Sequence, residues 1–166
     1  METSIQDNIR QINQRIEAAC KKAGRHPQEV RLLLATKTVE PERILQAFRC
    51  GCTLIGENKV QELRDKHEAL SAVAHTAHFI GHLQSNKIKE VIQYAQCIQS
   101  IDNLDTAQKL EQRLVQEDCR MEILIQVNTS AEESKFGCTP ESAESLARAI
   151  AALPHISIQG LMTIGL

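Results

Sequence analysis

Short apolar runs alternate with amphipathic helical patterns along the whole of this 166-residue sequence. Six of these runs have the length of strands, and they cover residues 31–36, 53–55, 78–81, 97–101, 121–128 and 156–164. Helical patterns fill the intervals, and one more precedes the first run. Because alternation at this spacing needs right-handed crossovers, it predicts a parallel sheet covered by helices. Alternation alone leaves open whether the sheet is doubly wound or a closed barrel.

The helical segments carry local start and stop signals. Thr3 and Gln6 have the spacing of a capping box, and Gly24 is placed to end that first helix. Asn103 and Thr139 are predicted to cap two later helices. The helix after the second apolar run is expected to bury one face, made of Val60, Leu63, His67 and Leu70. No linker or repeat interrupts the pattern, so we expect a single domain over residues 1–166.

The composition narrows the classes of partner. With 19 basic and 21 acidic side chains and no basic tract, the chain is a poor match for nucleic acid or an anionic membrane surface. No apolar segment approaches the roughly 20 residues of a membrane span, and the first residues do not have the pattern of a signal peptide. The six cysteines form no C-x-x-C pair, so we expect reduced thiols in a cytoplasmic protein.

Several familiar site motifs are absent from the sequence. The seven glycines never form a G-x-G-x-x-G or P-loop pattern, which excludes those two modes of nucleotide binding. His75 and His78 would point to opposite faces of an extended strand, so we predict no metal site. Polar residues gather instead where the apolar runs end, and they are Lys37, Glu57, Asn58, His82, Gln84, Asp102 and Asn128. Ligands of α/β folds bind at that edge, and helix capping hardly explains all of these residues together.

Lys37 stands at the end of the apolar run from Val30 to Thr38, which contains three consecutive leucines. The run is typical of a strand that is buried on both faces of a parallel sheet. An amine at its end is expected to be partly desolvated, which favours the neutral form that attacks a carbonyl and forms a Schiff base. The alternative is a strand-end lysine that points into water, and the strand pattern alone favours that alternative.

Five blocks of the sequence resemble, in the same order, blocks of one protein family. They are LLATKT at 33–38, IGENKVQE at 55–62, HFIGHLQSNK at 78–87, IQVN at 125–128 with Glu133 and KFG at 135–137, and GLMTI at 160–164. The second and third blocks are long enough to be highly specific. The family is the pyridoxal phosphate homeostasis proteins, whose single barrel is similar to the N-terminal domain of alanine racemase. The resemblance covers essentially the whole chain.

The resemblance implies a TIM-type (β/α) barrel that holds pyridoxal 5'-phosphate (PLP) as a Schiff base on Lys37. It also implies that Asn58 lies beside the cofactor and that His82 and Met162 line the same mouth. Family members continue for two more strands, which supply a phosphate-binding loop and an arginine facing the pyridine nitrogen. The chain is therefore expected to hold six of eight strand-helix units and to be incomplete at its C-terminus. Two open sheet edges would invite pairing between chains, and we expect a monomer or a weak homodimer.

Three functions follow as hypotheses. The first, which we prefer, is a non-catalytic PLP-binding protein of vitamin B6 homeostasis that passes the cofactor to PLP-dependent apoenzymes. The second is a racemase-like enzyme acting on amino acids. A racemase of this fold pairs its lysine with a tyrosine from a second domain, whereas the single tyrosine here, Tyr94, lies in a predicted helix. The third is a fragment that folds poorly and holds no cofactor.

Overall fold

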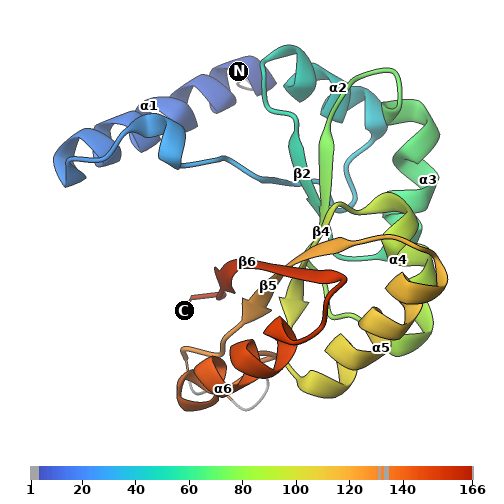
Figure 1. Cartoon of the computed structure of the whole chain (residues 1–166). Coiled ribbons are helices and arrows are strands. Elements are labelled where there is room, and N and C mark those ends of the chain that lie inside the picture. Colours follow the sequence, from blue (N-terminus) through green and yellow to red (C-terminus); the bar gives the residue numbers. More distant parts are fainter. Residues whose placement is uncertain (1–3, 131, 133–134, 166) are drawn as a thin grey trace.

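The computed structural model describes residues 4–130, 132 and 135–165. Six strands form one sheet in the order β1 to β6, and each strand is parallel to its neighbours. The elements are α1 (Ile5–Ala23), β1 (Leu34–Ala35), α2 (Pro41–Arg49), β2 (Leu54–Glu57), α3 (Val60–Leu70), β3 (Thr76–Phe79), α4 (Ile88–Tyr94), β4 (Cys97–Ile101), α5 (Leu104–Gln116), β5 (Met121–Gln126), α6 (Pro140–Ala151) and β6 (Ile156–Met162). The sheet curves, and helices α2 to α6 follow one side of it (Figure 1). The predicted α/β architecture, six units of a barrel, is confirmed.

The main core lies between the middle of the sheet and the helices. The best-buried side chains, each 0% exposed, include Ile98, Ile101, Ile123, Ile125, Leu110 and Leu114. They come from strands β4 and β5, which have a neighbour on each side, and from helix α5, which covers them. Burial of an aliphatic side chain contributes about 1.5 to 3 kcal/mol each, so this region dominates the stability of the chain.

The two edge strands differ from their predicted form. β1 is shorter than residues 31–36, with Leu34 half-buried and Ala35 exposed. The prediction of a strand buried on both faces is wrong because, among the described residues, β1 pairs only with β2, and an apolar sequence cannot supply a second neighbour. β6 also exposes apolar surface, since Leu161 is 65% exposed. The two open edges that the resemblance implied are thus present in the sheet.

Other strand boundaries move by one or two residues. β2 begins one residue later than predicted and ends at Glu57, two residues later, whereas β3 both begins and ends two residues earlier. β5 and β6 each end two residues earlier, and β4 has the predicted bounds. A strand ends where its pairing with a neighbour stops, and the hydrophobic pattern of one segment does not record that register.

The helix signals are mostly confirmed. Gly24 ends α1 with a φ of 64°, and Asn103 and Thr139 cap α5 and α6 as predicted. The cap of α1 is Ser4, whose hydroxyl accepts from the N–H of Asp7 at 3.1 Å; the predicted cap, Thr3, lies outside the described residues. Among the helices of the described ranges, none is long and apolar enough to cross a membrane.

Candidate functional site

Lys37 lies in a turn directly after β1, formed by residues 36–39 and called the lysine turn below. The N–H of Val39 donates to the carbonyl oxygen of Thr36 at 3.0 Å and closes the turn. Thr38 has a φ of 60°, a left-handed conformation that is uncommon for a β-branched residue. The turn places Lys37 at the carboxyl end of its strand, as predicted.

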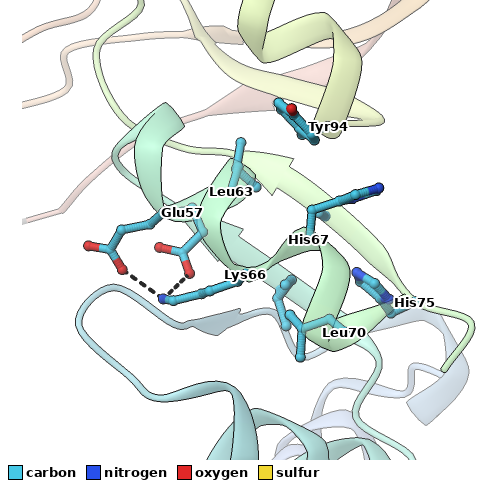
Figure 2. A pocket seen from close by; sticks show the side chains of 10 residues that line it. Glu57, Leu63, Lys66, His67, Leu70, His75 and Tyr94 are labelled. Atoms are coloured by element: carbon cyan, nitrogen blue, oxygen red, sulfur yellow. Dashed lines mark hydrogen bonds and ion pairs between the residues drawn. The ribbon is translucent and has the colours of Figure 1, made fainter. Parts of the chain in front are cut away.

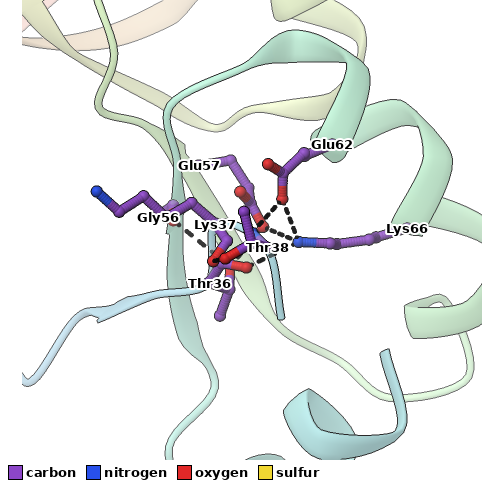
Figure 3. Close-up of polar contacts among 7 residues, drawn as sticks. All are labelled: Thr36, Lys37, Thr38, Gly56, Glu57, Glu62 and Lys66. Atoms are coloured by element: carbon purple, nitrogen blue, oxygen red, sulfur yellow. Dashed lines mark hydrogen bonds and ion pairs between the residues drawn. The ribbon is translucent and has the colours of Figure 1, made fainter. Parts of the chain in front are cut away.

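Thr36 and Lys37 point to opposite sides of the sheet. Thr36 is 4% exposed, and its hydroxyl donates to Glu57 Oε1 at 2.6 Å. Lys37 is exposed, and its side chain extends away from α3 (Figure 3). Its carbonyl oxygen accepts from the Thr38 hydroxyl at 2.6 Å, while its amine has no hydrogen-bond or ion-pair partner within residues 4–130, 132 and 135–165. The expected partial desolvation is wrong, because β1 has no second neighbour in this sheet to cover the amine.

Three charged residues, Glu57 of β2 with Glu62 and Lys66 of α3, form a cluster behind the lysine turn (Figure 3). Lys66 Nζ donates to Glu57 Oε1 at 2.7 Å, to Glu62 Oε2 at 2.7 Å and to the Thr36 carbonyl oxygen at 2.8 Å. Glu62 Oε2 also accepts from the N–H of Thr38 at 2.8 Å. The cluster therefore holds both residues that flank Lys37.

The cluster is withdrawn from solvent yet carries charge. Glu57 is 0% exposed, and the side chain of Lys66 is 12% exposed. Desolvation works against the charge of Lys66, but hydrogen bonds to Glu57 and Glu62 outweigh it and raise the pKa of Lys66 above 10.5. The hydrogen bond from Lys66 in turn lowers the pKa of Glu62 below 4.5. Lys66 and Glu62 are therefore both ionised at neutral pH.

Glu57 was predicted to lie with Lys37 at the mouth, and that prediction is wrong. As the last residue of β2 it faces α3, where its Oε2 atom is buried without a hydrogen-bond partner in the described chain. It lines a cavity of about 10 Å³, room for one water molecule, together with Lys66, His75 and Tyr94 (Figure 2). The outcome follows from side-chain alternation, because Thr36 and Glu57 share the helix-facing side of their strands.

The inward face of α3 also differs from the prediction. His67 is exposed, while the side chain of Lys66 is 12% exposed. Lys66 follows Leu63 by three residues and precedes Leu70 by four, and both leucines are buried. Its position in the apolar stripe was therefore readable from the helical spacing. A lysine on a helix is usually solvated, and for that reason sequence reasoning missed Lys66.

At the other end of the sheet, polar residues of the carboxyl edge hold the loop that follows β5. Asp102 Oδ2 accepts from the N–H of Gly137 at 3.1 Å. The side-chain amide of Asn128 donates to the carbonyl oxygen of Glu132 at 2.9 Å. These two predicted site residues are therefore engaged with their own chain.

His82 and Met162 were both expected to line the mouth. The ring of His82 stacks on Phe136, with ring centroids 3.9 Å apart. Met162 ends β6 and lines a separate cavity of about 230 Å³ with Thr129 and Ala143. A mouth shared by His82 and Met162 stays a prediction. Glu133, quoted above for the family resemblance, lies outside the described residues.

Asn58 is exposed directly after β2, on the same edge as Lys37. Its carbonyl group approaches Gly81 so closely that a Cβ at that position would clash with it. Glycine at position 81 thus lets the loop after β3 pack against the Asn58 backbone. The structure brings Asn58 to the carboxyl edge, and a contact with the cofactor stays a prediction.

The chain is similar in sequence to proteins of known families. The sequence model of the alanine racemase N-terminal domain matches residues 3–165. Pyridoxal phosphate homeostasis proteins of Aquifex aeolicus and Vibrio cholerae are 38% and 41% identical to the chain over 95% and 97% of its length, and the chain covers 69% and 70% of theirs. The chain belongs to the pyridoxal phosphate homeostasis protein family. The predicted membership is thereby confirmed.

Several solved structures have a fold similar to that of this chain. An unknown protein from Bifidobacterium adolescentis, 41% identical, has a TM-score of 0.92 over 97% of this chain and 69% of its own. PipY of Synechococcus elongatus, solved with PLP bound, is 26% identical with a TM-score of 0.74 over 90% of this chain and 70% of its own. Alanine racemase from Corynebacterium glutamicum, 13% identical, has a TM-score of 0.65 over 81% of this chain and 39% of its own. That last likeness concerns the fold alone.

Proposed function

We propose that this member of the family binds PLP and that Lys37 forms a Schiff base with the aldehyde of the cofactor. In that reaction Nζ of Lys37 bonds to the aldehyde carbon, and the carbonyl oxygen leaves as water. The observation that carries the proposal is the free, exposed amine in the lysine turn, at the carboxyl edge where α/β folds bind ligands. PipY, a protein of similar fold, was solved with PLP bound.

Two other lysines in loops of the carboxyl edge each have a carboxylate beside them. Lys135 lies 3.2 Å from Glu132, and Lys87 lies 3.8 Å from Glu90. The amine of each of these two lysines is engaged with a carboxylate, whereas Lys37 has no such partner among the described residues. Asn58, exposed after the neighbouring strand, supplies an amide that can donate to or accept from the cofactor. We therefore propose that Lys37 and Asn58 contact the aldehyde end of PLP.

We propose a carrier of PLP rather than an enzyme. Racemisation needs a proton acceptor on one face of the substrate and a donor on the other. The single tyrosine of the chain, Tyr94, ends α4 and packs against His67 with ring centroids 5.1 Å apart. It lines the cavity between the sheet and α3, whereas Lys37 extends away from α3 (Figures 2 and 3). The racemase-like alternative therefore has no opposing group in Tyr94.

The name of the family's members supports a role in vitamin B6 homeostasis. We propose that the chain holds PLP reversibly and releases it to PLP-dependent apoenzymes, because a Schiff base is reversed by water. The six free cysteines suit a reducing compartment, and we place the protein in the cytoplasm. The open edges of β1 and β6 support a monomer that associates weakly into a homodimer.

The visible absorption spectrum with added PLP tests the proposal. The wild-type chain is expected to give Schiff-base absorbance that borohydride removes while fixing the cofactor to the protein. Lys37→Ala is expected to abolish both signals, and the matched control Lys87→Ala is expected to keep them. Full retention of borohydride-fixed cofactor in Lys37→Ala would contradict the proposal.

A separate assay tests the absence of racemase activity. The chain, PLP and L-alanine are incubated together, and D-alanine is measured against PLP alone. We expect no D-alanine above that background. Formation of D-alanine that Lys37→Ala abolishes would establish the enzyme instead.

A further inference from the structure

We infer that Lys66 is a positioning residue for Lys37, and that the cluster of Glu57, Glu62 and Lys66 exists to fix the lysine turn. The inference deepens the proposed function and rests on it, since it concerns how the amine is presented to PLP. It assigns a role to a buried charged group that does not itself face the cofactor edge.

The cluster contacts the turn at three atoms. The carbonyl oxygen of Thr36 accepts from Lys66 Nζ at 2.8 Å, and the hydroxyl of Thr36 donates to Glu57 Oε1 at 2.6 Å. The N–H of Thr38 donates to Glu62 Oε2 at 2.8 Å. Lys37 is thus flanked on both sides by backbone that α3 and β2 hold. Its Cα position is set by these contacts, although its own side chain takes no part in them.

The conformation of the turn needs this support. The φ of 60° at Thr38 lies in a region that favours glycine, and such strain persists where the surrounding structure over-determines it. The bond from Thr38 to Glu62 forms only if Glu62 Oε2 is held in place. Lys66 holds it there through its 2.7 Å bond to the same oxygen. Removing Lys66 therefore breaks the bond to the Thr36 carbonyl and loosens the bond from Thr38 to Glu62, and leaves the bond from the Thr36 hydroxyl to Glu57.

The same geometry excludes Lys66 from reacting in place of Lys37. An ammonium group has three donors, and those of Lys66 are all used, by Glu57, Glu62 and the Thr36 carbonyl. The amine of Lys37 lies on the other side of the turn (Figure 3). One lysine holds the backbone, and the other is left free to react.

The first experiment measures the rate at which PLP is fixed to Lys37. Lys66→Met keeps an unbranched side chain, one heavy atom shorter, and removes the three donors of Nζ. We expect the rate to fall by about tenfold to about a hundredfold, the range expected when a reacting group is misplaced by up to 1 Å. Lys66→Arg keeps the charge and donors and is expected to restore most of the rate. Lys109→Met, which breaks an exposed ion pair with Asp105 on α5, is the control and is expected to change nothing.

The second experiment needs no cofactor and avoids leaving a buried charge unpaired. Glu62→Ala removes the acceptor of the Thr38 amide, and hydrogen exchange of that amide is followed by NMR. We expect exchange at Thr38 to quicken by about fivefold or more, the effect of one lost hydrogen bond, while amides of α5 stay unchanged. The same variant is expected to fix PLP more slowly at Lys37.

The outcomes separate this inference from the proposed function. If wild-type chain fixes PLP at Lys37 and both Lys66→Met and Glu62→Ala, shown to be folded, fix it at the wild-type rate, Lys66 has no positioning role. That result would leave the proposed function intact. If the wild-type chain fixes no PLP at Lys37, the proposed function itself fails, whereas unchanged exchange at Thr38 in Glu62→Ala would overturn the inference alone.

Discussion

The two ends of the sheet use their polar residues in opposite ways. Around β1, the charges of Glu57, Glu62 and Lys66 are buried behind the lysine turn, and the amine of Lys37 stays free. Around β5, Asp102 and Asn128 lie at the carboxyl edge itself and hold the loop that follows. Both arrangements fix a loop, but only the first leaves a reactive group without a partner in the described residues.

The hydrogen bonds of polar side chains indicate where function can be sought on a sheet of this kind. A polar residue at the carboxyl edge is not evidence of a site when its hydrogen bonds are used within the chain. A buried charged cluster is costly unless every member is paired, so its presence behind an edge strand calls for a reason. Here the reason is a turn with a strained threonine and a lysine at its centre.

The largest effect is expected from breaking the buried cluster. Lys66→Met leaves Glu57 buried and uncompensated, and we expect the free energy of unfolding to fall by about 3 to 5 kcal/mol. Lys109→Met, at an exposed pair with Asp105, is expected to cost less than about 1 kcal/mol. Urea unfolding of the two variants measures both values. Equal losses would show that the cluster contributes no more than a surface ion pair.

A smaller effect is expected from pH. Because the pKa of Glu62 is lowered in the folded chain, its contribution to stability is present above 4.5 and is lost as the pH falls through the folded value. Lys66 has a raised pKa, so its contribution is complete below 10.5 and is lost as the pH rises through the folded value. Below pH 4.5, the free energy of unfolding measured with urea should depend less on pH in Glu62→Gln than in the wild-type chain.

His78 provides the internal control for that measurement. Burial, with the nearby charge of Arg31, lowers the pKa of His78, so the folded chain loses stability as the pH falls below 6.5 in both proteins. The difference between the two curves therefore isolates Glu62. Identical slopes below 4.5 would show that Glu62 gains nothing from Lys66.

The smallest effect is expected at the β5 end. Asp102→Asn weakens the bond that Asp102 accepts from Gly137, and Asn128→Ala removes the side-chain bonds of Asn128 to Ser130, Glu132 and Lys135. We expect the unfolding free energy to fall by about 1 kcal/mol for each well-formed bond that is lost. Neither variant should change the rate at which PLP is fixed by borohydride. If either slows fixation as much as Lys66→Met does, the contrast between the two ends of the sheet is wrong.

Much of the fold is predictable from the sequence because its signals are local. The caps Asn103 and Thr139 and the terminator Gly24 act within one helical turn, and all three occur where predicted. The alternation of elements fixes a parallel sheet through general rules of handedness. The extent of β1 was not predictable in this way, because burial of Leu34 and Ala35 depends on how many strands pair beside them.

The candidate site is predictable in part for a similar reason. Lys37 and Asn58 follow apolar runs, and their positions at the carboxyl edge need only the order of the strands. Glu57 was expected beyond the end of β2, but it is the last residue of that strand, and side-chain alternation turns it toward α3. Lys66 was missed because a lysine on a helix is usually solvated, and because two of its partners, Glu57 and the Thr36 carbonyl, come from segments distant in the sequence.

The lysine that carries the cofactor can be mapped directly. The wild-type chain is mixed with less than one equivalent of PLP, reduced with borohydride, digested, and analysed by mass spectrometry for the pyridoxyl group. We predict a single modified peptide with the group on Lys37. A label found on Lys135 or Lys87, or spread evenly over exposed lysines, would contradict the claim that the lysine turn is the PLP site.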